Sequence, residues 1–279
     1  MRRVAKVARL VAVAVIVAIG VNSVVWAVAD WHLADMHVYQ DAALRLRAGQ
    51  QLYGGDVDTL SAYRYAPWFA YAWIPLTLLP QPVIDVGWSG FLLAASAIVT
   101  WLVVRPASRP RVALALLMGP ILFGISAIGN MQAPMLALLM IGMPRRWAGF
   151  AIGVAASLKV VPLLLVLALV AERRWTQAGI AMATSAILWA PVLWMGTAPV
   201  TLDPGLARTL PVPLWLAVAG AAVSIAVFMA WQRSRYSALA AATGALLALP
   251  RLFVYDISLL VMATLDWRHR EKPSRQDGP

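Results

Sequence analysis

The chain has 279 residues, of which 62% are hydrophobic and 13% charged, and it contains no cysteine. Soluble domains carry about 45–50% apolar and about 25% charged residues, so this composition indicates an integral membrane protein. It excludes a disordered chain, and the lack of cysteine excludes a disulfide-stabilised fold. A soluble enzyme with a single anchor is also excluded, because apolar runs recur from Leu10 to Leu265. Basic cytoplasmic loops explain the net charge of +11 better than a nucleic-acid partner does.

The N-terminal part predicts one membrane helix followed by a long polar loop. The first apolar run, 10–29, follows four basic residues, so we expect an uncleaved helix with a cytoplasmic N-terminus. Ala27-Val28-Ala29 resembles a signal-peptidase site, but the run is long and many spans follow. Residues 30–82 are then the first extracytoplasmic loop. It includes an interfacial or re-entrant helix over 66–80, whose prolines, tryptophans and tyrosines suit the membrane interface.

The remaining apolar runs predict nine further spans, over 83–104, 112–128, 131–143, 147–158, 160–171, 176–195, 213–231, 237–249 and 254–266. The fourth and fifth of these runs could instead be one tilted helix over 147–171. A break at Lys159 puts both termini and most of the 23 lysines and arginines in the cytoplasm, whereas one helix divides them about evenly. The positive-inside rule therefore favours the break, which leaves half-length helices whose ends must be covered by protein.

Together these runs predict an all-α polytopic membrane protein with about ten transmembrane helices. We expect a single membrane domain over 1–279 in the plasma (inner) membrane, with a basic cytoplasmic tail over 267–279. Most acidic residues fall on the extracytoplasmic side, and the cytoplasmic loops are short. Any active site is therefore expected to be extracytoplasmic.

Two residues are the leading candidates for chemistry. Lys159 lies among apolar residues, where a charge is costly and marks a functional site; its ammonium could hold a lipid phosphate. The alternative is a lysine that extends to the interface from a helix end. Asp35 is a candidate general base, or else a helix cap or a solvated loop acid.

Other polar clusters have two possible interpretations. Residues 129–132 could belong to a site or form a tight turn. Arg251 and Asp256 flank the last span and could form a salt bridge. The aromatic residues of 63–73 suit the interface, but they also suit a sugar site, where rings stack on apolar sugar faces. His32, Asp35 and His37 lack a standard zinc spacing, and we predict no metal.

Several of these segments resemble glycosyltransferase family 87, the polyprenyl-phosphate-sugar-dependent transferases of the membrane-embedded C-type superfamily. Its N-terminal signature is matched in order by Asp35 to Tyr39, Ala42-Ala43, Gly49, Leu52-Tyr53, Tyr65-Ala66-Pro67 and Pro75 to Pro80. The resemblance continues with Gly129 to Gln132, with 148–162 around Lys159, with Arg173-Arg174-Trp175, and with Pro250 to Asp256, which is similar to one bacterial branch. The chain departs from the pattern at Ala66, where a second proline is common, and it is shorter than is usual.

The resemblance implies a C-type fold and an inverting hexosyltransferase of the cell envelope. It would move a sugar, most commonly mannose, from polyprenyl phosphate to a hydroxyl of a lipid or glycan acceptor. Asp35 would be the base, and Lys159, Arg251 and Arg64 would bind the donor phosphate, with no cofactor or metal required. The further candidates for substrate binding are Tyr39, Asp41, Tyr65, Trp68, Asn130, Gln132 and Asp256.

Two other classes of protein are alternatives to this one. A transporter or flippase of a lipid-linked or small substrate would place ionisable residues at the midplane and show repeat symmetry. In this sequence the ionisable residues collect on one side, and no repeat is visible. A shortened relative without activity is the other alternative, against which the presence of both Asp35 and Lys159 argues.

Overall fold

The computed structural model describes residues 32–53, 62–105, 109–196, 210–234, 236–249 and 253–264, together with three helical positions at 18, 22 and 25. Within these residues the structure consists of helices and turns with no strand, which confirms the all-α prediction. Apart from those three positions, the predicted first span lies outside the described residues, as does the basic tail.

The first half of the chain follows the predicted runs closely. Helix α2 spans Ala34–Arg47, in the predicted loop. The helix predicted over 66–80 is observed as α3 (Pro67–Trp73) followed by the 3-10 helix η1 (Ile74–Leu78). Each of these two, and the next helix, has proline in its first turn, where the missing N–H costs nothing. The run continues with α4 (Gln81–Val104), α5 (Arg109–Ala127), α6 (Gln132–Gly142) and α7 (Ala148–Leu158).

The predicted break at Lys159 is confirmed. Helix α7 ends at Leu158, and Lys159 has an extended backbone with φ −149° and ψ 118°. The chain becomes helical again in η2 (Val161–Leu165), where Pro162 prevents a continuous helix, and runs on into α8 (Val166–Ala171). The remaining helices are α9 (Trp175–Trp189), α10 (Val192–Met195), α11 (Val212–Trp231), α12 (Ser237–Leu247) and η3 (Val254–Thr264).

Three of the described helical segments are long and apolar enough to cross a membrane, namely Gln81–Val104, Trp175–Met195 and Val212–Trp231. The other apolar helices have 10–17 residues. An 11-residue helix is about 16 Å long, roughly half of the hydrocarbon core of a bilayer. The count of ten spans therefore stays a prediction, and the short helices must end within protein or at a polar site.

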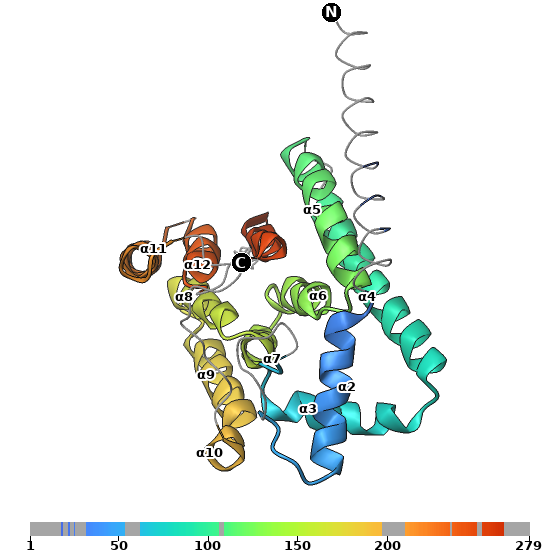
Figure 1. Cartoon of the computed structure of the whole chain (residues 1–279). Coiled ribbons are helices and arrows are strands. Elements are labelled where there is room, and N and C mark those ends of the chain that lie inside the picture. The colour runs from blue at the N-terminus through green and yellow to red at the C-terminus, as the bar shows by residue number, and fades with distance from the viewer. Residues whose placement is uncertain are drawn as a thin grey trace, which may run out of the picture.

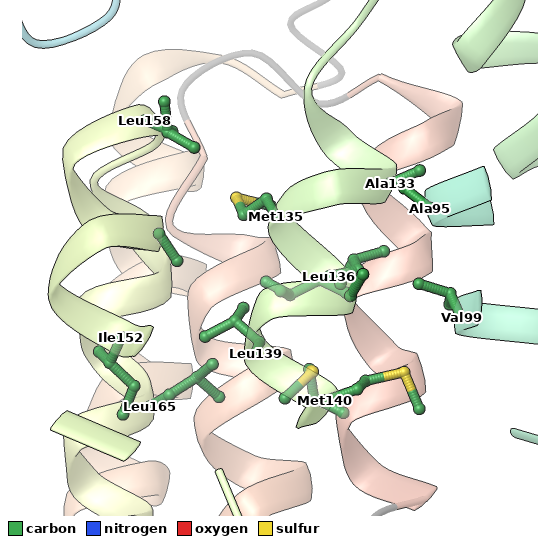
Figure 2. Packing of buried hydrophobic residues seen from close by; sticks show 14 of the residues in the cluster. Ala95, Val99, Ala133, Met135, Leu136, Leu139, Met140, Ile152, Leu158 and Leu165 are labelled. Atoms are coloured by element: carbon green, nitrogen blue, oxygen red, sulfur yellow. The ribbon is translucent and has the colours of Figure 1, made fainter. Parts of the chain in front are cut away.

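Helix α6 is the centre of the packing. It contacts α4 and α5 on one side, and α7 and η3 on the others (Figure 1). Nine of its 11 residues are buried, as expected for a helix that is apolar all round. Leu136, Leu139 and Met140 point into this core, with Val99 of α4 and Ile152 of α7 among their neighbours (Figure 2).

Helix α7 is fixed by close packing against α9. A Cβ at Gly149 would lie 2.1 Å from the carbonyl oxygen of Gln177, so only glycine allows this approach. The amide N–H of Gly149 also donates to Oε1 of Gln177 at 3.0 Å. This contact fixes the helix that directly precedes Lys159.

Candidate active site

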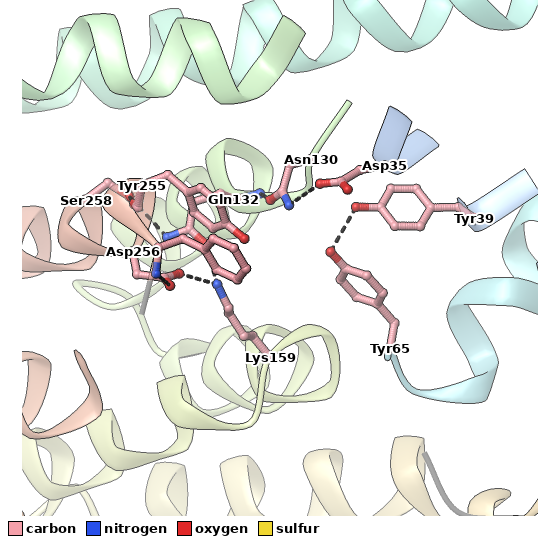
Figure 3. Close-up of polar contacts among 10 residues, drawn as sticks. Asp35, Tyr39, Tyr65, Asn130, Gln132, Lys159, Tyr255, Asp256 and Ser258 are labelled. Carbon is pink, nitrogen blue, oxygen red and sulfur yellow. Dashed lines mark hydrogen bonds and ion pairs between the residues drawn. The ribbon is translucent and has the colours of Figure 1, made fainter. Parts of the chain in front are cut away.

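The polar residues predicted from sequence meet where helices end. Asp35 lies in the first turn of α2, Asn130 and Gln132 lie at the turn between α5 and α6, Lys159 follows α7, and Asp256 lies in the first turn of η3. Their side chains face one another in Figure 3. The site thus occupies a region where short helices leave backbone groups that need polar partners.

Asp35 is positioned by the junction of α2 with α5. The backbone N–H groups of Leu33 and Asp35 donate to the carbonyl oxygens of Ala127 and Ile128, at 3.0 and 2.9 Å. These bonds give the backbone N–H groups at the start of α2 their partners, and no side chain caps that helix. The Asp35 carboxylate is therefore not used as a helix cap, and Oδ2 instead accepts a hydrogen bond from Nδ2 of Asn130 at 2.5 Å.

Gly129 allows α2 and the end of α5 to meet. Its φ is +92°, and a Cβ there would lie 2.8 Å from the backbone nitrogen of Met36. Its carbonyl oxygen accepts a hydrogen bond from Nε1 of Trp88 at 3.0 Å. The glycine turn therefore brings the amide of Asn130 to the carboxylate of Asp35.

Lys159 turns into the protein. Its ammonium forms an ion pair with Oδ1 of Asp256, donates to Oε1 of Gln132 at 3.4 Å, and lies 4.8 Å from the ring centroid of Tyr255. The Lys159 side chain is 28% exposed and that of Asp256 is 2% exposed. This geometry differs from a lysine that extends to the interface, since the charge is paired within the site.

Asp256 is held rigidly, and one neighbour was not predicted from sequence. Its Oδ2 accepts from the backbone N–H of Phe253 at 2.9 Å, so both carboxylate oxygens are occupied. The unpredicted neighbour is Ser258, which accepts from Nε2 of Gln132 at 3.1 Å and donates to the Tyr255 carbonyl at 2.6 Å. A serine within an apolar run was the only sequence signal for it.

The network is continuous from Asp35 to Asp256. Asn130 donates to Asp35, and the backbone N–H of Gln132 donates to Oδ1 of Asn130 at 2.8 Å. The side chain of Gln132 then meets Lys159, which is paired with Asp256. A carboxylate and an ammonium from distant parts of the sequence therefore belong to one hydrogen-bonded site.

The environment of Asp35 suits a base. Burial raises the pKa of its carboxyl above the ordinary value, while the Asn130 hydrogen bond and the positive charges of Lys159 and Arg64 lower it less. A partly buried carboxylate with a raised pKa takes up a proton more readily than an exposed aspartate.

Tyrosine side chains line the candidate site on the side of α2 and α3. The hydroxyls of Tyr39 and Tyr65 lie 2.9 Å apart, and Tyr53 donates to the carbonyl of Tyr65 at 2.8 Å. Burial is the main cause that raises the pKa of Tyr65, and the negative charges of Asp35 and Asp256 raise it further. Both carboxylates thus act on one hydroxyl, which stays protonated and available as a hydrogen-bond donor.

The structure does not bring every predicted residue into this network. Asp41 is exposed on α2, and Nε1 of Trp68 is bonded to Oγ of Ser157 at 2.8 Å. Arg64 is half-buried, and its charge reaches Asp35. Arg251 lies outside the described residues. Across the described segments, no three His, Cys, Asp or Glu side chains are grouped as a metal site.

Together the fold and the site define a helical membrane protein with a carboxylate–ammonium centre. The model of glycosyltransferase family 87 matches residues 63–204, which is half of the chain. The chain belongs to this family and is a membrane glycosyltransferase. The matched span includes Asn130, Gln132 and Lys159, whereas Asp35 and Asp256 lie outside it. No curated protein and no solved structure matches the chain.

Proposed function

We propose that the protein transfers a sugar, with mannose the first candidate, from a polyprenyl phosphate donor to a hydroxyl of an extracytoplasmic lipid or glycan acceptor. The observation that carries this proposal is the continuous network that joins the Asp35 carboxylate to the Lys159 ammonium. Transfer from a phosphate needs a base at the attacking hydroxyl and a cation at the leaving group.

In the proposed reaction the acceptor oxygen attacks the anomeric carbon on the face opposite the phosphate. A carbon–oxygen bond forms to the acceptor, and the bond between the anomeric carbon and the phosphate oxygen breaks with inversion. Asp35 takes the hydroxyl proton, and the electron pair leaves with polyprenyl phosphate. Such a base contributes about 10²–10⁴-fold to the rate.

Negative charge grows on the phosphate as its bond to the sugar breaks, so cations there stabilise the transition state. Lys159 is the first candidate because its ammonium lies inside the network and its side chain is partly exposed. Arg64 is the second, since its charge reaches Asp35. Arg251 is the third, on its position in the sequence alone. With these cations the proposal needs neither a metal nor a cofactor.

The membrane setting follows from the charge pattern. We place the site on the extracytoplasmic side of the plasma membrane and both termini in the cytoplasm, because the short basic loops favour that orientation. The lipid tail of the donor would lie against the apolar helices, with its phosphate at the helix ends that carry Lys159.

The test is a transfer assay with purified protein in nanodiscs, supplied with radiolabelled polyprenyl-phosphate-mannose and a lipid extract as acceptor. We expect labelled product from the wild type and a loss of at least 100-fold in Asp35→Asn, which keeps the shape of the side chain but cannot take the proton. Asp85→Asn is the matched control, because Asp85 lies on α4 and bonds to Gln81, outside the network. Equal product from wild type and Asp35→Asn would refute the assignment of the base, and no transfer from any polyprenyl-phosphate sugar would refute the function.

A further inference from the structure

Asp256 is poorly placed to touch a substrate. It is 1% exposed, and its two oxygens are bonded to the Lys159 ammonium and to the backbone N–H of Phe253. The group through which this carboxylate can reach the donor phosphate is therefore its ion-pair partner Lys159, whose side chain is 28% exposed.

Four charged groups of the described site interact with one another before a donor arrives. Two carboxylates, Asp35 and Asp256, interact with two cations, Lys159 and Arg64. Among these four described groups, the positive charge of Lys159 is therefore already partnered by a carboxylate before a phosphate binds.

The proposed reaction increases the negative charge of the phosphate. A polyprenyl phosphate sugar is a diester with one negative charge, whereas the released monoester carries about −1.5 to −2 at pH 7. A site with cations alone would thus bind the product more tightly than the donor, and release would become slow. The buried carboxylate beside Lys159 opposes this, since it offers the ammonium a fixed partner.

We propose that Asp256 is a positioning residue that controls product release, by pairing with Lys159 each time polyprenyl phosphate leaves. The inference rests on the proposed function. The long, flexible side chain of Lys159 contacts the phosphate and returns to Asp256, while Asp256 stays fixed by Phe253 and by the start of η3. Gln132, bonded to Ser258, holds the ammonium on its other side.

The experiment measures binding directly, without turnover, by titrating protein in nanodiscs with a short-chain polyprenyl phosphate and with its methyl ester, which carries one charge. In Asp256→Asn the side chain keeps its shape and loses its charge. We expect the Kd of polyprenyl phosphate to fall about 10-fold and that of the ester about threefold. In the transfer assay, kcat should fall and a burst of product should precede slow turnover.

Two controls separate this role from a structural one. Asp85→Asn makes the same change of charge outside the network and should leave both Kd values unchanged. In a Lys159→Gln background, Asp256→Asn should no longer tighten binding, because the partner through which it acts is gone. Unchanged or weaker binding of polyprenyl phosphate by Asp256→Asn would overturn the proposal.

The wild type provides a further test that does not depend on the variant folding. Because Asp256 offsets the extra charge, the wild type should bind polyprenyl phosphate no more than about threefold tighter than the ester; a preference above about 30-fold overturns the inference. Tighter binding by Asp256→Asn in a protein that transfers no sugar from any polyprenyl phosphate donor would support the pairing of Asp256 with Lys159 at a phosphate site, but it would refute the proposed function and with it the role in product release. Sugar transfer by the wild type, together with unchanged binding of polyprenyl phosphate by Asp256→Asn, would support the proposed function and overturn the inference. A wild type that binds no polyprenyl phosphate would overturn both.

Discussion

The hydrogen bond between Asn130 and Asp35 gives the sharpest prediction about the proposed base. Its length is 2.5 Å, and it lowers the pKa of a carboxyl that burial otherwise raises. Asn130→Ala removes this donor and raises the pKa of Asp35 further. Because the base acts only when deprotonated, activity falls as the pH drops through this pKa, and the variant should lose activity at a higher pH than the wild type does.

The size of the effect follows from the energy of the bond. A hydrogen bond to an ionised group contributes about 1.5–3 kcal/mol, and each 1.4 kcal/mol is a factor of ten. On the acidic side of the profile, kcat/KM of Asn130→Ala should therefore be about 10- to 100-fold below that of the wild type. The difference should narrow at higher pH, where Asp35 is ionised in both proteins.

The assay is the transfer reaction at saturating acceptor and low donor, measured across the pH range in which the protein stays folded. Gln40→Ala is the matched control, since it removes an exposed amide of α2 that bonds only to Gln81 in the described structure. A profile of Asn130→Ala with an unshifted acidic limb, or with one shifted to lower pH, would refute the assignment of Asp35 as a base held by Asn130.

Three further variants test the architecture of the site. Gly129→Ala should lower the free energy of unfolding by about 1–3 kcal/mol through strain at φ +92°, whereas Gly179→Ala, with open space around it, should not; thermal unfolding in detergent compares them. Lys159→Gln should cost about 3 kcal/mol because it leaves the buried carboxylate of Asp256 unpaired, and adding Asp256→Asn should restore stability; a double variant that is less stable still would contradict the pairing. Tyr65→Phe should lower the free energy of unfolding by about 1 kcal/mol, because it removes the hydrogen bond between the hydroxyls of Tyr39 and Tyr65; an unchanged thermal unfolding temperature would contradict that bond.

Much of the fold was predictable from local features. Apolar runs and prolines placed the described helices from α3 onwards to within a few residues, because a membrane helix must be continuously apolar and proline is tolerated in its first turn. Helix α2 was not predicted, since it is polar and lies in a stretch expected to be a loop. Charge counting predicted the break at Lys159 without any structural information, and the structure has an extended residue there. The number of complete spans was harder to predict, since a short apolar run in sequence does not show whether its ends are covered by protein.

Part of the candidate site was also predictable from the sequence. A lysine among apolar residues and an aspartate just after the first span stand out in the sequence, because a charged side chain in or near the membrane costs free energy. Asp41 did not join them, since six residues along a helix turn a side chain by about 240°, and it is exposed. Ser258 gave no signal beyond a serine in an apolar run, yet it holds Gln132.

The sequence by itself therefore determined the class of protein, the apolar helices, the break at Lys159 and the residue types available for chemistry. Only the tertiary structure decided the pairing of Asp35 with Asn130, 95 residues away, and of Lys159 with Asp256, 97 residues away. The physical reason lies in helices such as α6, which are apolar on every side and so carry no pattern that says which neighbour each face will meet. That choice depends on close contacts such as those at Gly129 and Gly149, which exist only once the helices pack.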